Sequence, residues 1–141
     1  MSVFDWYSLE IAPLLRKIDV RVKELGDGGS MEIGDAALLL EMPLDEAEKI
    51  AREAGVRGEV KEIDRRVFFI IMREGSSAVC RFYAREIACG SPESYTASQI
   101  SYIYSVKIQA VRAAFDLLRI KEAGGEAVPA VLSKISVKNL E

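Results

Sequence analysis

The feature that most constrains the fold is a pattern of small and apolar residues that occurs twice, 64 positions apart. Two short helices that cross at a tight turn need a small residue at the crossing, which Ala37 and Ser101 supply. The apolar positions correspond in pairs: Ala36 with Ile100, Leu39 with Ile103, Leu40 with Tyr104, Met42 with Val106, Leu44 with Ile108, Ala47 with Val111, and Ile50 with Ala114. We therefore expect two helix pairs, each with a free outer face on its second helix.

Helices account for most of the remaining sequence. Apolar residues recur at three- and four-residue intervals over residues 3–25, which predicts an amphipathic helix that either kinks at Pro13 or begins near Ala12. Glycines in residues 26–30 predict a flexible joint after it. The other expected helices cover residues 35–41, 44–54, 97–104 and 107–119, a segment ending near residue 88, and a segment beginning near Pro129.

Residues 59–72 are expected to form a β-hairpin. Polarity alternates over residues 59–63, a polar turn follows at residues 64–66, and residues 67–72 form an apolar run. This arrangement places Arg65 and Arg66 at the hairpin tip. The chain is thus predicted to be mainly α, with two helix-turn-helix-like units and one β-hairpin wing between them. The expected segments are 1–30, 31–74 and 75–141.

The stretch MEIGDAALLLEMPLDEAEKIAREAGVRGEVKEIDRRVFFI, residues 31–70, contains the first of these units. It resembles the winged helix-turn-helix domains of the excisionase and MerR type. Those domains run as a short strand, two helices, a glycine-containing link and a wing hairpin with basic residues near its tip. The matching residues are Ile33, Ala36, Ala37, Leu40, Ile50, Gly55, Gly58, Arg65, Arg66 and Phe69. The resemblance implies a DNA-binding domain.

Charge separates the two predicted helix pairs. The second helix of the first pair exposes four acids, which the DNA backbone repels: Asp45, Glu46, Glu48 and Glu53. The second helix of the second pair presents Lys107, Gln109 and Arg112 near its beginning. Arginine reads guanine, glutamine reads adenine, and lysine and arginine also bind phosphates. Ser98 and Ser105 are further candidates for phosphate contacts. The alternative is a charged face that only keeps the domain soluble.

Two function classes follow from this charge pattern. The first is a small regulator that binds double-stranded DNA mainly through the second unit, at Lys107, Gln109 and Arg112. Arg65 and Arg66 at the wing tip are either additional DNA contacts or solvated turn residues. The second class is a protein-interaction adaptor that keeps the helix packing without DNA contact. The apolar residues of 3–25 and 67–72 exceed what one small core would absorb, so we expect a homodimer that buries Phe4, Tyr7, Ile11 and Ile18.

Catalytic and cofactor motifs are not found in the sequence. There is no histidine, no glycine-rich phosphate loop and no nucleophile elbow, so we expect no enzyme activity, no catalytic residues, no cofactor and no metal. Cys80 and Cys89 are expected to be reduced packing residues, and the tyrosines near residue 104 are expected to be core. No secretory signal or membrane span is apparent, so a cytoplasmic protein without membrane contact is expected.

Overall fold

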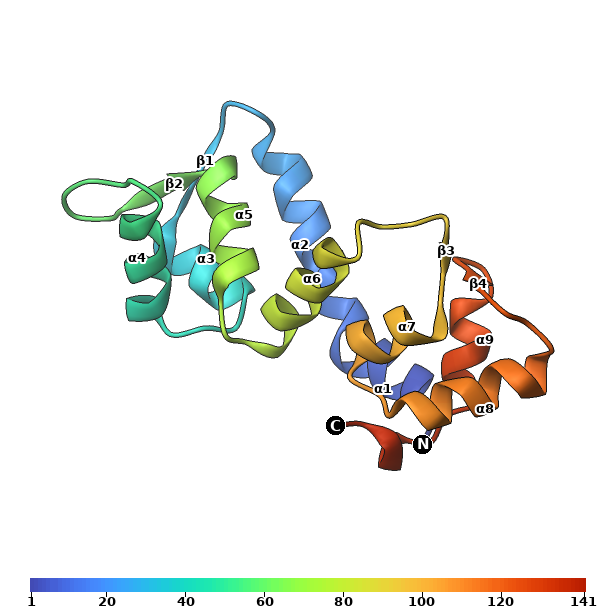
Figure 1. Cartoon of the computed structure of the whole chain (residues 1–141). Coiled ribbons are helices and arrows are strands. Elements are labelled where there is room, and N and C mark those ends of the chain that lie inside the picture. Colours follow the sequence, from blue (N-terminus) through green and yellow to red (C-terminus); the bar gives the residue numbers. More distant parts are fainter. The chain divides into compact units, whose positions relative to one another are not determined.

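A computed structural model describes residues 1–141 and shows a mainly helical chain with two small antiparallel sheets. The chain divides into two compact units (Figure 1). The middle unit comprises residues Ala12–Ala84, and the terminal unit comprises Met1–Ile11 with Arg85–Glu141. The chain divides after residues 11 and 84. The segments expected from the sequence, 1–30, 31–74 and 75–141, have other boundaries. No helix combines the length and the apolar composition that a membrane span requires.

The predicted N-terminal helix is two helices, α1 (Val3–Glu10) and α2 (Ala12–Leu25). Pro13 lies in the first turn of α2, where a missing N–H leaves no intrahelical hydrogen bond unmade. The start near Ala12 is therefore confirmed. The two helices serve different cores, because α1 packs on helix α9 (Val128–Ser133) of the terminal unit and α2 packs on α3 (Ile33–Leu39) of the middle unit.

The middle unit continues as a strand, two helices, a strand and a helix. These are β1 (Ser30–Glu32), α3, α4 (Leu44–Glu53), β2 (Glu62–Asp64) and α5 (Arg65–Glu74), and α6 (Ala78–Ala88) follows across the unit boundary. β1 and β2 pair antiparallel, with Met31 opposite Ile63. Figure 1 shows the loop between α4 and β2 projecting beyond this strand pair.

The terminal unit has the same order of elements. These are β3 (Ser94–Tyr95), α7 (Ala97–Tyr104), α8 (Ile108–Leu118), β4 (Ala123–Gly124) and α9, followed by a 3₁₀ helix, Val137–Asn139. β3 and β4 pair antiparallel, with Tyr95 opposite Ala123. Thr96 caps α7, because its side chain accepts the N–H of Gln99 over 3.2 Å.

The turns of the two helix pairs have the same backbone geometry. Glu41 and Ser105 are left-handed, with φ of 55° and 53°. One residue later, each turn is closed by a 3.0 Å hydrogen bond to a carbonyl five residues back, from the N–H of Met42 to Ala37 and from that of Val106 to Ser101. Ala37 is buried, and the Ser101 hydroxyl donates to the Val106 carbonyl over 2.6 Å. Both predicted turns are therefore present.

The repeat extends past the segment in which the sequence reveals it. The second helix of each pair ends in a left-handed residue, Gly55 or Arg119. The N–H of the residue after it then donates over 3.1 Å to a carbonyl five residues back, from Val56 to Ala51 and from Ile120 to Phe115. From the second strand onwards the offset is 60 residues instead of 64, as for Ile63 and Ala123. At this offset the third helices also bury corresponding residues, Phe68 and Val128, Ile71 and Val131, and Met72 and Leu132. The whole strand–helix–helix–strand–helix order thus occurs twice.

The predicted β-hairpin wing is wrong. Residues 65–74 form helix α5, and β2 pairs with β1 instead of with a following strand. The buried residues of α5 are Val67, Phe68, Ile71 and Met72, which is the spacing of one helix face. Asp64 starts the helix because its carboxylate accepts the N–H of Val67 over 2.8 Å. The residues assigned to the hairpin turn are in fact an N-cap and the first helical turn.

Candidate nucleic-acid interface

Helix α8 has one buried face and one exposed face. Val111, Ala114 and Phe115 are buried in the core of the terminal unit. The opposite face consists of Gln109, Arg112, Ala113, Asp116 and Leu117, all exposed. This separation follows from the 3.6-residue helical period and leaves the outer face of α8 open within the terminal unit.

The first part of this face carries the three residues that the sequence predicts to bind DNA in this unit. Lys107 is the N-cap residue of α8, and Gln109 and Arg112 lie in its first two turns. All three are exposed, and Lys107 and Arg112 take part in no salt bridge. The positive end of the helix dipole adds to these cations. The start of α8 is therefore suited to an anion, with an amide and a guanidinium available beside it.

A polar groove lies next to this start of the helix. It has a volume of about 410 Å³, and its walls include Arg85, Ser98, Ser101, Ser105 and Glu141. The Arg85 guanidinium donates to the Ser105 hydroxyl, and the Glu141 N–H donates to the Ser105 carbonyl over 2.7 Å. Ser98 and Ser105, the candidates for phosphate contacts, thus share one groove. Arg85 was missed, because it lies on α6 and no spacing in the sequence relates it to the helix pair.

Helix α4 presents the opposite charge at the corresponding positions. Asp45 stands where α8 has Gln109, and Glu48 stands where α8 has Arg112. Glu48 pairs with Arg52 at 3.5 Å, and Glu46 accepts the Ser76 hydroxyl over 2.5 Å. The acids of α4 are therefore partly used in local contacts, and its outer face repels phosphate.

Arg65 and Arg66 are not at a wing tip. They begin helix α5 in the middle unit, whereas Lys107, Gln109 and Arg112 belong to the terminal unit. Arg65 pairs with Asp27 at 2.9 Å and lies 5.8 Å from the centre of the Phe69 ring, and Arg66 donates to the Ala54 carbonyl over 3.5 Å. Both side chains thus contact their own unit, and the structure gives them no hairpin from which to reach DNA.

Comparison with known proteins does not identify the chain. No family model, curated protein or solved structure matches it. The chemistry of its own residues therefore carries the functional inference.

Cys80 and Cys89 are free cysteines, and Cys80 lacks the surroundings of a reactive thiol. Cys80 is buried in the core of the middle unit, and burial is the main reason that its pKa is raised. Ser77 caps the helix at this point, because its hydroxyl accepts the Cys80 N–H over 3.4 Å. Across the chain no group of three or more His, Cys, Asp and Glu residues is placed to hold a metal ion.

Proposed function

We propose that this protein is a cytoplasmic DNA-binding regulator of the helix-turn-helix type that contacts double-stranded DNA mainly through the terminal unit. The observation that carries this proposal is the outer face of α8. Lys107, Gln109 and Arg112 are exposed there at the start of the second helix of a helix pair, and neither cation is neutralised by a salt bridge.

These three residues supply the contacts that a recognition helix needs. Lys107 at the helix end is suited to a phosphate, which fixes the position of the helix on the duplex. Arg112 and Gln109 are suited to paired hydrogen bonds with guanine and adenine in the major groove. The chain as a whole has a net charge of −3, so its affinity for DNA must come from this local surface.

A protein-interaction adaptor is the second candidate, and specific observations favour it. Leu117 is 68% exposed on the same face of α8 as Arg112, and Asp116 lies beside it. In the other helix pair Leu38 is 79% exposed at the end of α3. An apolar side chain exposed on the outer face of a helix can pack against another protein. In this function the outer face of α8 would bind a protein instead of DNA.

A titration against duplex DNA distinguishes these two functions. The 141-residue chain is titrated at low salt with a random-sequence duplex and with a duplex selected from a random pool. A DNA-binding regulator binds both, and binds the selected duplex more tightly. An affinity no better than about 10⁻⁴ M for either duplex would remove the DNA function and favour the adaptor.

A homodimer is part of the proposal, because helix-turn-helix dimers read two half-sites. Two of the four residues expected at the interface, Ile11 and Ile18, are buried within the chain and cannot contact a second copy. Phe4 and Tyr7 on α1 are only partly exposed, and the Tyr7 ring also meets the Tyr104 ring. Sedimentation at micromolar concentration should show a species of twice 15.6 kDa. A single 15.6 kDa species at all concentrations would reject the homodimer.

A further inference from the structure

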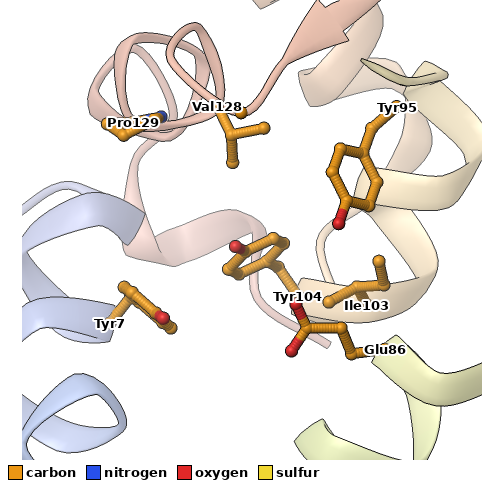
Figure 2. A pocket seen from close by; sticks show the side chains of 8 residues that line it. Tyr7, Glu86, Tyr95, Ile103, Tyr104, Val128 and Pro129 are labelled. Atoms are coloured by element: carbon orange, nitrogen blue, oxygen red, sulfur yellow. The ribbon is translucent and has the colours of Figure 1, made fainter. Parts of the chain in front are cut away.

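The terminal unit contains a pocket walled by three tyrosines and one carboxylate (Figure 2). Its volume is about 260 Å³. The lining comes from α1, α6, β3, α7 and α9 and includes Tyr7, Glu86, Tyr95, Tyr104, Val128 and Pro129. Five elements therefore contribute to one cavity within one compact unit.

The aromatic rings stand around a common space. Tyr7 and Tyr104 meet edge to face, with ring centres 5.5 Å apart and planes at 73°. Figure 2 shows Tyr95 across the cavity from Tyr7, with Tyr104 between them. The face of an aromatic ring carries partial negative charge and attracts cations. Rings that line one cavity can hold a cation against a ring face.

Glu86 adds a formal negative charge to this aromatic wall. Its side chain is partly buried, it has no hydrogen bond or salt bridge, and burial raises the pKa of its carboxyl above the ordinary 4.5. The Glu86 charge also contributes to the raised pKa values of Tyr95 and Tyr104, after the burial of each phenol. A carboxylate that has lost water without gaining a partner is unfavourable, and a bound cation relieves this cost.

The protein supplies no cation of its own to the pocket, because no lysine or arginine lines it. The remaining walls are apolar, with Ile103, Val128 and Pro129 suited to alkyl groups. One carboxylate among phenols is a poor ligand set for a metal ion, which prefers several oxygen ligands. The volume of 260 Å³ equals that of roughly nine water molecules, so the occupant is small.

We propose that this pocket binds a small organic cation, an alkylated ammonium ion of about the size of choline. The three tyrosine rings hold the alkylated nitrogen, the Glu86 carboxylate balances its charge, and the apolar wall of Ile103, Val128 and Pro129 contacts its carbon atoms. This site goes beyond DNA binding and does not depend on it, because none of its residues belongs to the outer face of α8.

The probe is choline, compared with 3,3-dimethylbutan-1-ol, which has the same shape without the charge. Both are titrated into the 141-residue chain by calorimetry, at neutral pH and constant ionic strength. Choline should bind saturably. The alcohol should bind with an affinity at least about ten times lower. Equal binding of both compounds, or no saturable binding at about 10 mM choline, would overturn the proposal.

Glu86→Gln tests the charge without changing the shape of the side chain. We expect this variant to lose about ten- to a hundredfold in choline affinity and to bind the neutral alcohol as before. Glu10→Gln is the matched control, because Glu10 is an exposed acid of the same unit, and it should bind choline like the unmodified protein. Thermal unfolding of each variant checks that the fold is retained. A folded Glu86→Gln variant with unchanged choline affinity would refute the charge pairing.

The pH dependence gives an independent readout of the same group. The other titratable side chains around Glu86 are Tyr7, Tyr95, Tyr104 and Cys89. Phenols do not ionise in acid, so only the carboxyl changes charge there. Choline affinity should fall as the pH decreases through the raised pKa of Glu86, and Glu86→Gln should abolish this decrease. An identical acid profile in both proteins would contradict the assignment.

Discussion

Phe68→Ala is expected to lower the free energy of unfolding of the middle unit by about 3–5 kcal/mol. Phe68 is 0% exposed and is the largest fully buried side chain of the chain. It lies on the inner face of α5, with its ring centre 5.6 Å from that of Phe69. Removing the ring leaves a cavity in a core that has no solvent access. Urea unfolding followed by circular dichroism measures the loss.

The same experiment tests whether residues 65–74 form a helix. A helix buries Phe68 and Ile71 together, whereas alternation in a strand would place Phe68 and Ile70 on one side. Ile71→Ala should therefore cost about 2–5 kcal/mol, and Ile70→Ala should cost less, because Ile70 is only partly buried. Leu38→Ala, at a residue that is 79% exposed, is the control and should change stability by less than about 0.5 kcal/mol. A larger loss from Ile70→Ala than from Ile71→Ala would contradict the helix.

Lys107→Ala and Arg112→Ala are expected to weaken DNA binding in different ways. Removing the Lys107 ammonium should lower the affinity for all duplexes alike and reduce the salt slope by about one, because one phosphate contact is lost. Removing the Arg112 guanidinium should instead lose about 1–3 kcal/mol of discrimination at one base pair of the selected site. Titration of each variant against the random and the selected duplex at several salt concentrations separates the two effects.

Glu48→Gln provides the matched control for these variants. Glu48 occupies in α4 the position that Arg112 occupies in α8. We expect this substitution to leave DNA binding unchanged, because the proposed DNA contact is made by α8 and not by α4. Glu46 is less suitable for this purpose, since its carboxylate accepts a hydrogen bond from the Ser76 hydroxyl. A large gain in affinity from Glu48→Gln would mean that α4, and not only α8, lies against the duplex.

The two helix pairs could be predicted because their signals are local. A small residue such as Ala37 at a helix crossing, and apolar residues spaced for one helix face, depend on positions less than twenty residues apart. The Thr96 cap of α7 is another signal of this kind, since it acts on the helix that it precedes. The left-handed conformations of Glu41 and Ser105 carry no such signal, because neither residue is a glycine.

The β-hairpin was predicted because a short apolar run does not distinguish a buried strand from one face of a helix. The Asp64 cap and the spacing of Val67, Phe68 and Ile71 favour a helix. The hairpin prediction instead assigns residues 64–66 to a turn and residues 67–72 to a strand. The pairing of β1 with β2 joins segments about thirty residues apart, and no local pattern specifies it. Local signals thus favour helix α5, whereas the pairing of β1 with β2 depends on the tertiary fold.

The candidate DNA-binding residues divide in the same way. Exposure of Lys107, Gln109 and Arg112 follows from the helical period of α8, so the sequence could predict it. Arg85 comes to Ser105 through the tertiary fold.

The tyrosines near residue 104 were expected to be core, yet Tyr102 is 51% exposed, and Tyr95 and Tyr104 line the pocket with Tyr7 and Glu86. A cavity that combines five elements leaves no periodic signature in the chain.

The most direct test of DNA binding through α8 is to map amide chemical shifts by NMR during titration with the selected duplex. A chain of 15.6 kDa is small enough for the assignment of individual amides. We predict that the largest shifts fall on residues 107–112 and on Ser98, while the outer face of α4, residues 44–53, does not respond. Shifts confined to α4, or no shifts at duplex concentrations well above about 10⁻⁴ M, would contradict the proposed function.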